Sequence, residues 1–211
     1  MNSKKNSAFS TGKTVRLAVL AAVLILMGFT PLGYLRINPV MVITFNMIPV
    51  VIGAITIGPT GGAILGAIFG FTSFSQALLG LDVLGTALLG QSARSAILLF
   101  VMCMVPRILA GWLPGLIFRA LNTKGEGRRL VAIAIVALSG SVFNTIFFVA
   151  AFVGFFATNP EIISTFGTSD VWTIITFLIT TNAIIEAIVC TIVGGAIGRA
   201  IFPAAKRQKV Q

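Results

Sequence analysis

Long apolar stretches separated by short polar or glycine-rich breaks make up most of this chain, and they predict membrane-spanning helices. An α-helix needs about 20 apolar residues to cross the hydrocarbon core of a bilayer. Open sheet edges are not tolerated there, and the stretches lack the two-residue alternation of strands. The pattern therefore predicts an all-α integral membrane protein, a bundle of six transmembrane helices at about residues 14 to 30, 46 to 58, 60 to 79, 98 to 121, 129 to 156 and 171 to 202.

Two of the breaks between these stretches carry further information. The second stretch is short, and Gly58 and Pro59 join it to the third through a tight turn, which predicts an antiparallel helical hairpin. Between the third and fourth stretches, residues 84 to 89 are apolar enough to lie along the membrane surface or to dip into it. This segment is not counted as a seventh span, because an odd number of spans would put basic segments on both sides of the membrane.

Lysine and arginine residues gather at the ends of the apolar stretches and predict the orientation of the chain. Residues 1 to 13, the link 122 to 129 and residues 203 to 211 carry most of them, and all three share one side if there are six spans. That side is expected to be the cytoplasm. Residues 14 to 202 would then form a multi-pass domain in the cell membrane, flanked by two basic cytoplasmic tails. The first apolar stretch is expected to be a retained helix, not a cleaved signal peptide.

Composition agrees with a membrane protein and excludes several functions. Hydrophobic residues make up 57% of the 211 residues and charged residues only 9%, too few for the surface of a soluble domain. The net charge of +10 comes from basic residues scattered at helix ends, so nucleic acid is not an expected partner. With no histidine and two distant cysteines, Cys103 and Cys190, a His or Cys/His metal site and a Ser-His-Asp triad are unavailable, and no cofactor is expected.

Four polar residues interrupt the apolar stretches at a similar depth. Arg107 lies in the fourth stretch, Asn144 in the fifth, and Asn182 and Glu186 in the sixth, where a spacing of four puts them on one helix face. At 1.5 Å per residue they lie roughly 14 to 22 Å below the outer ends of their helices. Because ionisable groups in a membrane usually face the bundle interior or a cavity, we predict a substrate pocket there in which Glu186 orients Arg107. The alternative is a structural pair of these two residues, with the asparagines bridging helices.

Four further residues are weaker candidates for contact with a substrate. Gln91 and Arg94 stand at the outer entrance of the fourth stretch, where they could meet an anionic ligand or simply face solvent and headgroups. Tyr34 and Arg36 lie in the first outer connection and could help to close a lid, although both residue types are common at membrane interfaces without any ligand.

Small residues form two stripes that permit close helix packing. Ala18 and Ala22 make a small-xxx-small face on the first stretch, and Gly62, Gly66 and Gly70 make another on the third. Such a face serves internal packing as well as docking of a partner helix. The motif alone does not separate the two uses.

The order and spacing of these features resemble the substrate-binding S components of energy-coupling factor (ECF) vitamin transporters. The resemblance covers about residues 15 to 201. It rests on the basic tail before Ala18-x-x-x-Ala22 and on the segments IPVVIGAITIGPTGGAILGAIFGF, VPRILAGWLPGLIFRAL, SGSVFNTIFF and TTNAIIEAIV. It implies the six-helix S-component fold and high-affinity capture of a vitamin from outside the cell. The pantothenate type is the most similar.

The resemblance also implies partners. S components work with a transmembrane coupling protein, EcfT, and two cytoplasmic ATPases, EcfA and EcfA′, in an ABC-type importer. The face of Ala18 and Ala22 would dock on the coupling protein. The chain has no GxxxxGK[ST] motif and is expected not to be an enzyme, which agrees with ATP hydrolysis by partner subunits.

Several substrates and one other class of protein remain open. Arg107 could bind a carboxylate, Asn144 an amide and Glu186 hydroxyl groups, a combination that suits pantothenate. Few tyrosines and tryptophans argue mildly against a flavin, but phenylalanine can stack too, so riboflavin and hydroxymethylpyrimidine stay as alternatives. A stand-alone secondary carrier is the competing class. An intramembrane enzyme is disfavoured because Glu186 is the only acidic residue deep in a span and histidine is absent.

Overall fold

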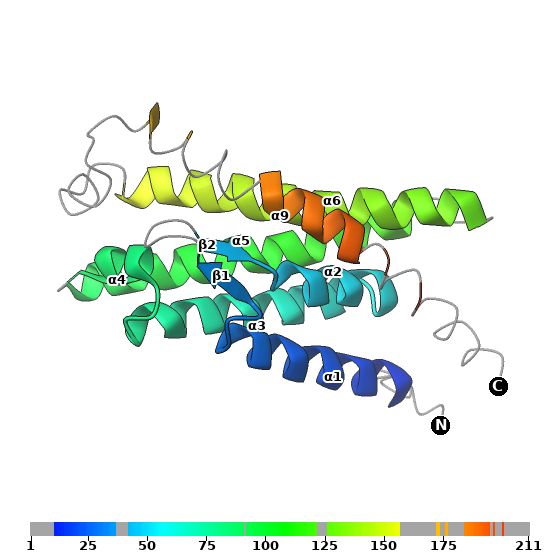
Figure 1. Ribbon diagram of the computed structural model, residues 1–211, viewed down its shortest axis with the longest axis horizontal. Coiled ribbons are helices and arrows are strands. Elements are labelled where there is room, and N and C mark those ends of the chain that lie inside the picture. Colours follow the sequence, from blue (N-terminus) through cyan, green and yellow to red (C-terminus); the bar gives the residue numbers. More distant parts are fainter. Residues whose placement is uncertain are drawn as a thin grey trace, which may run out of the picture.

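The protein is mostly helical in the computed structural model. The structure describes residues 11–36, 42–90, 92–121, 126–156, 172–173, 176, 184–194, 196 and 200. Four of its helices are long and apolar enough to cross a membrane: α1 (Thr11–Gly28), α3 (Pro59–Leu78), α5 (Ala93–Ala120) and α6 (Glu126–Phe156). They run along the long axis of the molecule and pack side by side across it, in the order α1, α3, α5, α6 (Figure 1). These helices confirm the first, third, fourth and fifth predicted stretches as helical.

Shorter helices lie between and beside the long ones. α2 (Met47–Thr56) confirms that the second stretch is a short helix, and the Gly58–Pro59 turn leads directly into α3. α4 (Val83–Leu89) packs against α3 and α5, so the connection around residues 84 to 89 is not a simple loop. α9 (Ile184–Val189) continues into a π-helical turn, η2 (Cys190–Gly194), and both contact α6. Most of the sixth predicted span lies outside the described residues.

A two-stranded hairpin departs from the all-α prediction. β1 (Tyr34–Arg36) pairs antiparallel with β2 (Val42–Thr44), and Tyr34 stands opposite Thr44. The three residues of β2 are all β-branched, which favours extended backbone. The amide of Phe45 donates to the Gly33 carbonyl at 2.9 Å and prolongs the pairing. Strands of three residues are too short to produce a periodic pattern, which is why the sequence did not predict them.

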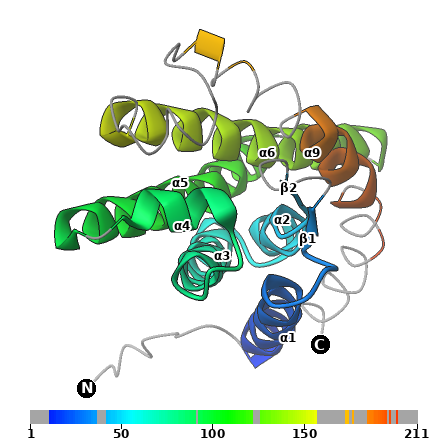
Figure 2. The same cartoon turned by 60° about the vertical axis from the view of Figure 1, so that its left-hand side comes forward.

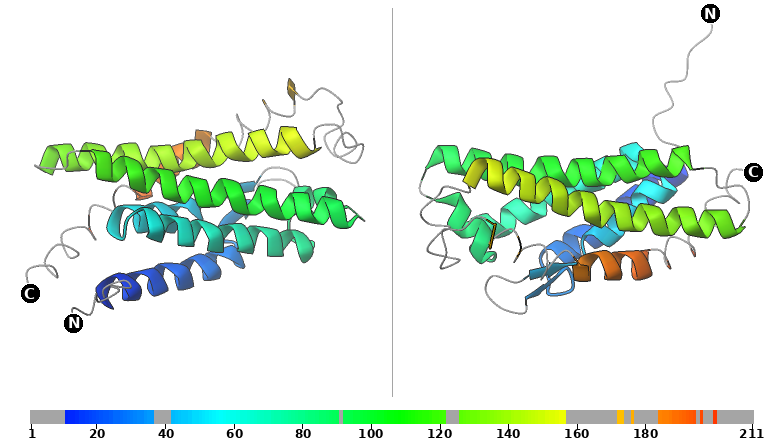
Figure 3. Two further views of the ribbon diagram at one scale, coloured as in Figure 1. Left: turned by 180° about the vertical axis from the view of Figure 1, so that it is seen from behind. Right: turned by 90° about the horizontal axis from the view of Figure 1, so that it is seen from above.

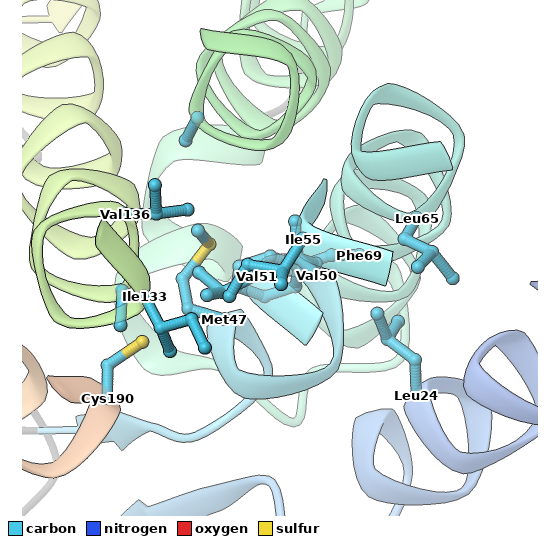
Figure 4. Packing of buried hydrophobic residues seen from close by; sticks show 12 residues of the cluster. Leu24, Met47, Val50, Val51, Ile55, Leu65, Phe69, Ile133, Val136 and Cys190 are labelled. Atoms are coloured by element: carbon cyan, nitrogen blue, oxygen red, sulfur yellow. The ribbon is translucent and has the colours of Figure 1, made fainter. Parts of the chain in front are cut away.

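α2 is the central helix of the described structure. It contacts α1, α3, α5, α6 and η2, and nearly all of its side chains are buried. Figure 4 shows side chains of α2 between residues of α1 and α3 on one side and residues of α6 on the other; those labelled on α2 are Met47, Val50, Val51 and Ile55. Because protein surrounds α2, its sequence is apolar on every face.

The glycine stripe of α3 packs against α5 inside the protein. A Cβ added to Gly66 would stand 2.8 Å from the carbonyl carbon of Arg107, and one added to Gly70 would stand 2.6 Å from the Cys103 carbonyl oxygen. Carbon atoms in good contact are about 3.5–4.0 Å apart, so side chains at these positions would force the helices apart. The stripe therefore serves internal packing and fixes the distance between α3 and the backbone that carries Arg107.

Basic side chains meet at one end of the bundle. Arg16 Nη1 donates to the Thr56 carbonyl oxygen at 3.4 Å, and Arg119 Nη2 stands 3.2 Å from the position of a Cβ on Gly58. One end of the bundle therefore contains the start of α1, the turn between α2 and α3, and the end of α5. α4 lies at the opposite end, as both views in Figure 3 show. Most of the predicted basic segments, residues 1 to 13, 122 to 129 and 203 to 211, lie outside the described residues.

Candidate functional site

Arg107 lies in the interior of α5 and is only 7% exposed. It follows Pro106, which has no backbone N–H, so the Met102 carbonyl lacks the donor that residue 106 would normally supply. The guanidinium takes that place, with Nη1 donating to the Met102 carbonyl oxygen at 2.9 Å. Its Cζ stands 5.5 Å from the ring centre of Phe69 and 4.8 Å from that of Phe148, within the range of cation–π contacts. Nε is buried without a hydrogen-bond partner.

One face of α6 carries buried polar side chains together with Phe148, the residue that contacts Arg107. Ser141, Asn144 and Phe148 are spaced by three and four residues and therefore share this face. Phe148 contacts the Arg107 guanidinium, which turns the face toward α5. Ser141 is fully buried and Asn144 is 6% exposed, and neither the Ser141 hydroxyl nor the Asn144 amide oxygen has a hydrogen-bond partner. Both atoms are therefore buried polar groups that the described protein groups leave unsatisfied.

The hairpin and the start of α2 bring further polar groups to the same region. Burial raises the pKa of Tyr34 to about 12, and the positive charge of Arg107 is close enough to oppose that shift. Asn46 precedes α2, but its side chain makes no capping hydrogen bond, and its Oδ1 lies 2.7 Å from the position of a Cβ on Gly33. The Tyr34 hydroxyl interacts with the side chains of Asn46 and Ser73, but neither it nor the two polar atoms of the Asn46 amide makes a hydrogen bond of good geometry.

Glu186 connects α9 to the hairpin. Its carboxylate, in a side chain only 5% exposed, accepts a hydrogen bond from the backbone amide of Thr44 at 3.1 Å. Figure 2 shows α9 beside α6 and the hairpin. The charge of Arg107 acts on the carboxyl group through space, but no ion pair joins the two within the described ranges. The predicted direct pairing is therefore absent there: the Met102 carbonyl holds the guanidinium, and Glu186 holds the end of β2.

These side chains form what we call the Arg107 cluster, which consists of Tyr34, Asn46, Arg107, Ser141, Asn144 and Glu186. A buried polar atom without a partner costs about 1–3 kcal/mol, and buried polar groups in native proteins are normally satisfied by protein, water or ligand. The cluster offers donors and acceptors around one positive charge. The N-terminus of α2 adds a partial positive charge at its edge. The residues that the structure describes include no group of acidic, cysteine or histidine side chains suited to a metal ion.

The structure brings three of the predicted residues into this cluster and leaves others apart. Glu186 and Tyr34 lie close enough to Arg107 for its charge to act on them, and Asn144 lies one helical turn from Phe148, which contacts the guanidinium. Arg94 is exposed in the first turn of α5, about 20 Å along the helix from Arg107 at 1.5 Å per residue.

The remaining predicted residues fall elsewhere or outside the described parts. Arg36 ends β1, but its side chain is not among the described ones, and Gln91 and Asn182 lie outside the described residues. Ala18 and Ala22 are both exposed on α1 and take no part in the cluster.

The sequence did not predict Asn46 as a residue of this cluster. It is completely buried at the junction of β2 and α2, yet a single asparagine before an apolar run usually indicates only a helix cap. The signal was its combination with a span too short to cross the membrane alone, because a short central helix must end inside the protein. Its first residues then face buried groups instead of water.

A multi-pass membrane architecture with an enclosed polar cluster defines a membrane protein suited to hold a small polar molecule. The chain matches the family model for the ECF transporter, substrate-specific component, over residues 13–197. It therefore belongs to this family, whose members are substrate-binding subunits of transporters and not enzymes themselves. Comparison with curated proteins found no relative that matches the chain.

Proposed function

We propose that this protein captures a vitamin from outside the cell in the Arg107 cluster and delivers it inward with partner subunits, and that the vitamin is pantothenate. The observation that carries the proposal is the set of buried polar atoms without hydrogen-bond partners around one buried guanidinium. Each such atom costs about 1–3 kcal/mol when it stays unsatisfied. A ligand with complementary groups removes that cost, so binding is favoured by groups that the fold already holds in position.

The charge of the cluster favours a ligand with a carboxylate. Arg107 keeps Nε free for an acceptor while Nη1 is held by Met102. The start of α2 adds the positive end of a helix dipole, which attracts anions. Glu186 would repel a carboxylate placed beside it, but its hydrogen bond to the Thr44 amide directs at least one of its oxygens to the hairpin.

The uncharged groups of the cluster suit a ligand with hydroxyl and amide groups. The Asn46 amide offers a donor and an acceptor, Asn144 an acceptor, and Ser141 a hydroxyl. The rings of Phe69 and Phe148 already contact Arg107 and are less available to sandwich a flat ring. This favours flexible pantothenate over riboflavin or hydroxymethylpyrimidine.

We propose that α1 docks on a transmembrane coupling protein that is joined to two cytoplasmic ATPases. α1 is the least buried of the long helices, with 11% of its span buried. Ala18 and Ala22 form a small face on it, beside Val15 and Val19, which are 56% and 57% exposed. Small residues let two helix backbones approach closely within a membrane.

The chain is proposed to cross the membrane six times with both termini in the cytoplasm. The basic end marked by Arg16 and Arg119 would then be the cytoplasmic end, as the enrichment of positive residues in cytoplasmic segments predicts. The hairpin would close the opposite, outer side of the Arg107 cluster.

Binding of radiolabelled pantothenate, riboflavin and hydroxymethylpyrimidine to the purified protein tests the proposal. Arg107→Ala and Arg119→Ala each remove one arginine from α5, but Arg119 is exposed near its last turn. We expect Arg107→Ala to raise Kd about 10- to 100-fold, as for a hydrogen bond to a charged group, and Arg119→Ala to leave it unchanged.

Each other outcome of this experiment has a defined meaning. Binding of a different vitamin with the same dependence on Arg107 would keep the site and replace the substrate. Equal affinities of the two variants would contradict the site. Uptake of the vitamin by cells that lack the coupling protein and ATPases would favour a secondary carrier.

A further inference from the structure

α5 contains two buried prolines, Pro106 and Pro114, in the middle of a membrane-length helix. Each lacks an N–H and so deprives the carbonyl four residues earlier, that of Met102 or Ala110, of its usual helical donor. Of these two carbonyls, the Met102 carbonyl alone accepts a hydrogen bond from a described side chain, and the donor is the Arg107 guanidinium at 2.9 Å. The two prolines therefore differ in what replaces the lost hydrogen bond.

We propose that Pro106 is a positioning residue for Arg107: by keeping the Met102 carbonyl free, it gives the guanidinium a fixed acceptor inside an apolar helix. The bond runs backward along α5, the direction in which helical side chains lean. It is combined with the contacts to Phe69 and Phe148, which hold the guanidinium from two sides. Nε is left without a partner in this arrangement and is the group that a ligand can use.

A residue with a backbone N–H at position 106 would weaken this positioning of the guanidinium. Its N–H would bond to the Met102 carbonyl as in any helix, and Nη1 would have to share that acceptor with it. The guanidinium would then hold a shared acceptor less firmly, and its orientation would depend more on packing. The consequence for ligand affinity rests on the proposed function, whereas the fixed orientation of Arg107 does not.

Nuclear magnetic resonance of the full chain in detergent, labelled with ¹⁵N-arginine, tests the orientation without any ligand. The Arg107 signal is identified by its loss in Arg107→Lys. A guanidinium held at Nη1 rotates slowly about the Cζ–Nη bond, so we expect separate Nη signals for Arg107 in the unchanged protein and in Pro114→Ala. We expect them to merge in Pro106→Ala. Fast rotation in the unchanged protein, or slow rotation that survives Pro106→Ala, would overturn the proposal.

Binding of radiolabelled pantothenate, riboflavin and hydroxymethylpyrimidine shows whether the orientation matters for affinity. We expect Pro106→Ala to raise Kd about tenfold, the order expected for a hydrogen bond to a charged group, and Pro114→Ala to leave Kd within about twofold. In an Arg107→Ala background, Pro106→Ala should have no further effect, since residues that act through one another are not additive. The same loss with and without Arg107 would refute a positioning role. If none of the three vitamins binds the unchanged protein, the proposed function fails while the resonance experiment still decides the role of Pro106.

Discussion

Replacement of Gly66 by alanine should separate the effect of close helix packing from that of helix propensity. A Cβ at this position would stand 2.8 Å from the Arg107 carbonyl carbon and 3.1 Å from the Ile108 Cα. Good carbon contacts need about 3.5–4.0 Å, and the Cβ would also clash with the Arg107 carbonyl oxygen, so the two backbones must move apart by about 1 Å. Backbone atoms cannot rotate away as a side chain can. Overpacking of this kind costs about 1–3 kcal/mol.

Gly154 provides the matched control within the same chain. It is exposed in α6, and a Cβ added there would meet nothing within 4 Å. Alanine gains about 1 kcal/mol over glycine in a helix at either position, so the difference between the two variants isolates the steric cost at Gly66. Unfolding by sodium dodecyl sulfate in mixed micelles, followed by tryptophan fluorescence, should show Gly66→Ala less stable than Gly154→Ala by about 1–3 kcal/mol. Equal stability of the two variants would refute the close packing of α3 on the Arg107 backbone.

Three other predictions concern the docking face, the hairpin and the cluster. Ala18→Trp or Ala22→Trp should abolish co-purification of the coupling protein while vitamin binding persists. A bulky side chain on this exposed face would separate α1 from the coupling protein without touching the Arg107 cluster. Intact assembly of both variants with the coupling protein would count against docking at this face. Glu186→Ala should speed hydrogen exchange at the Thr44 amide about tenfold or more. Glu186→Gln keeps a carbonyl acceptor, so exchange at this amide should stay slow. Equal exchange rates in the two variants would show that the hydrogen bond to Glu186 does not protect the Thr44 amide. Asn46→Leu should weaken vitamin binding about tenfold with little loss of stability, since the amide makes no hydrogen bond of good geometry in the protein and interacts only weakly with the Tyr34 hydroxyl. A large loss of stability would argue instead for a structural role.

The helices were predictable because burial in lipid imposes a strong and simple pattern. α3 and α6 begin and end within three residues of the predicted stretches, and the turn at Gly58 was evident from its residues alone. α5 begins five residues before the predicted start, because Ser92 caps it through the Arg94 amide and polar residues such as Arg94 are tolerated in an exposed first turn. Helix ends in water carry less of the apolar signal than helix centres in lipid.

The convergence of Arg107, Asn144 and Glu186 was predictable from depth, but their partners were not. Depth along a helix follows from residue counting, so three polar residues at similar depth suggested a shared site. The acceptor of Arg107 is a backbone carbonyl released by Pro106, and the donor to Glu186 is a backbone amide 142 positions earlier in the chain. Backbone groups are present at every residue, so the sequence does not indicate which one a side chain will meet. The hairpin that supplies the Thr44 amide is likewise too short to predict.

Native mass spectrometry of the protein purified in detergent tests the central claim most directly. The claim is that the Arg107 cluster holds a small vitamin. We expect the unchanged protein, released gently from detergent, to carry an additional mass that matches pantothenate, and we expect Arg107→Ala to lose it while Arg119→Ala keeps it. A protein that carries no additional mass and gains none from added pantothenate, riboflavin or hydroxymethylpyrimidine would contradict the claim.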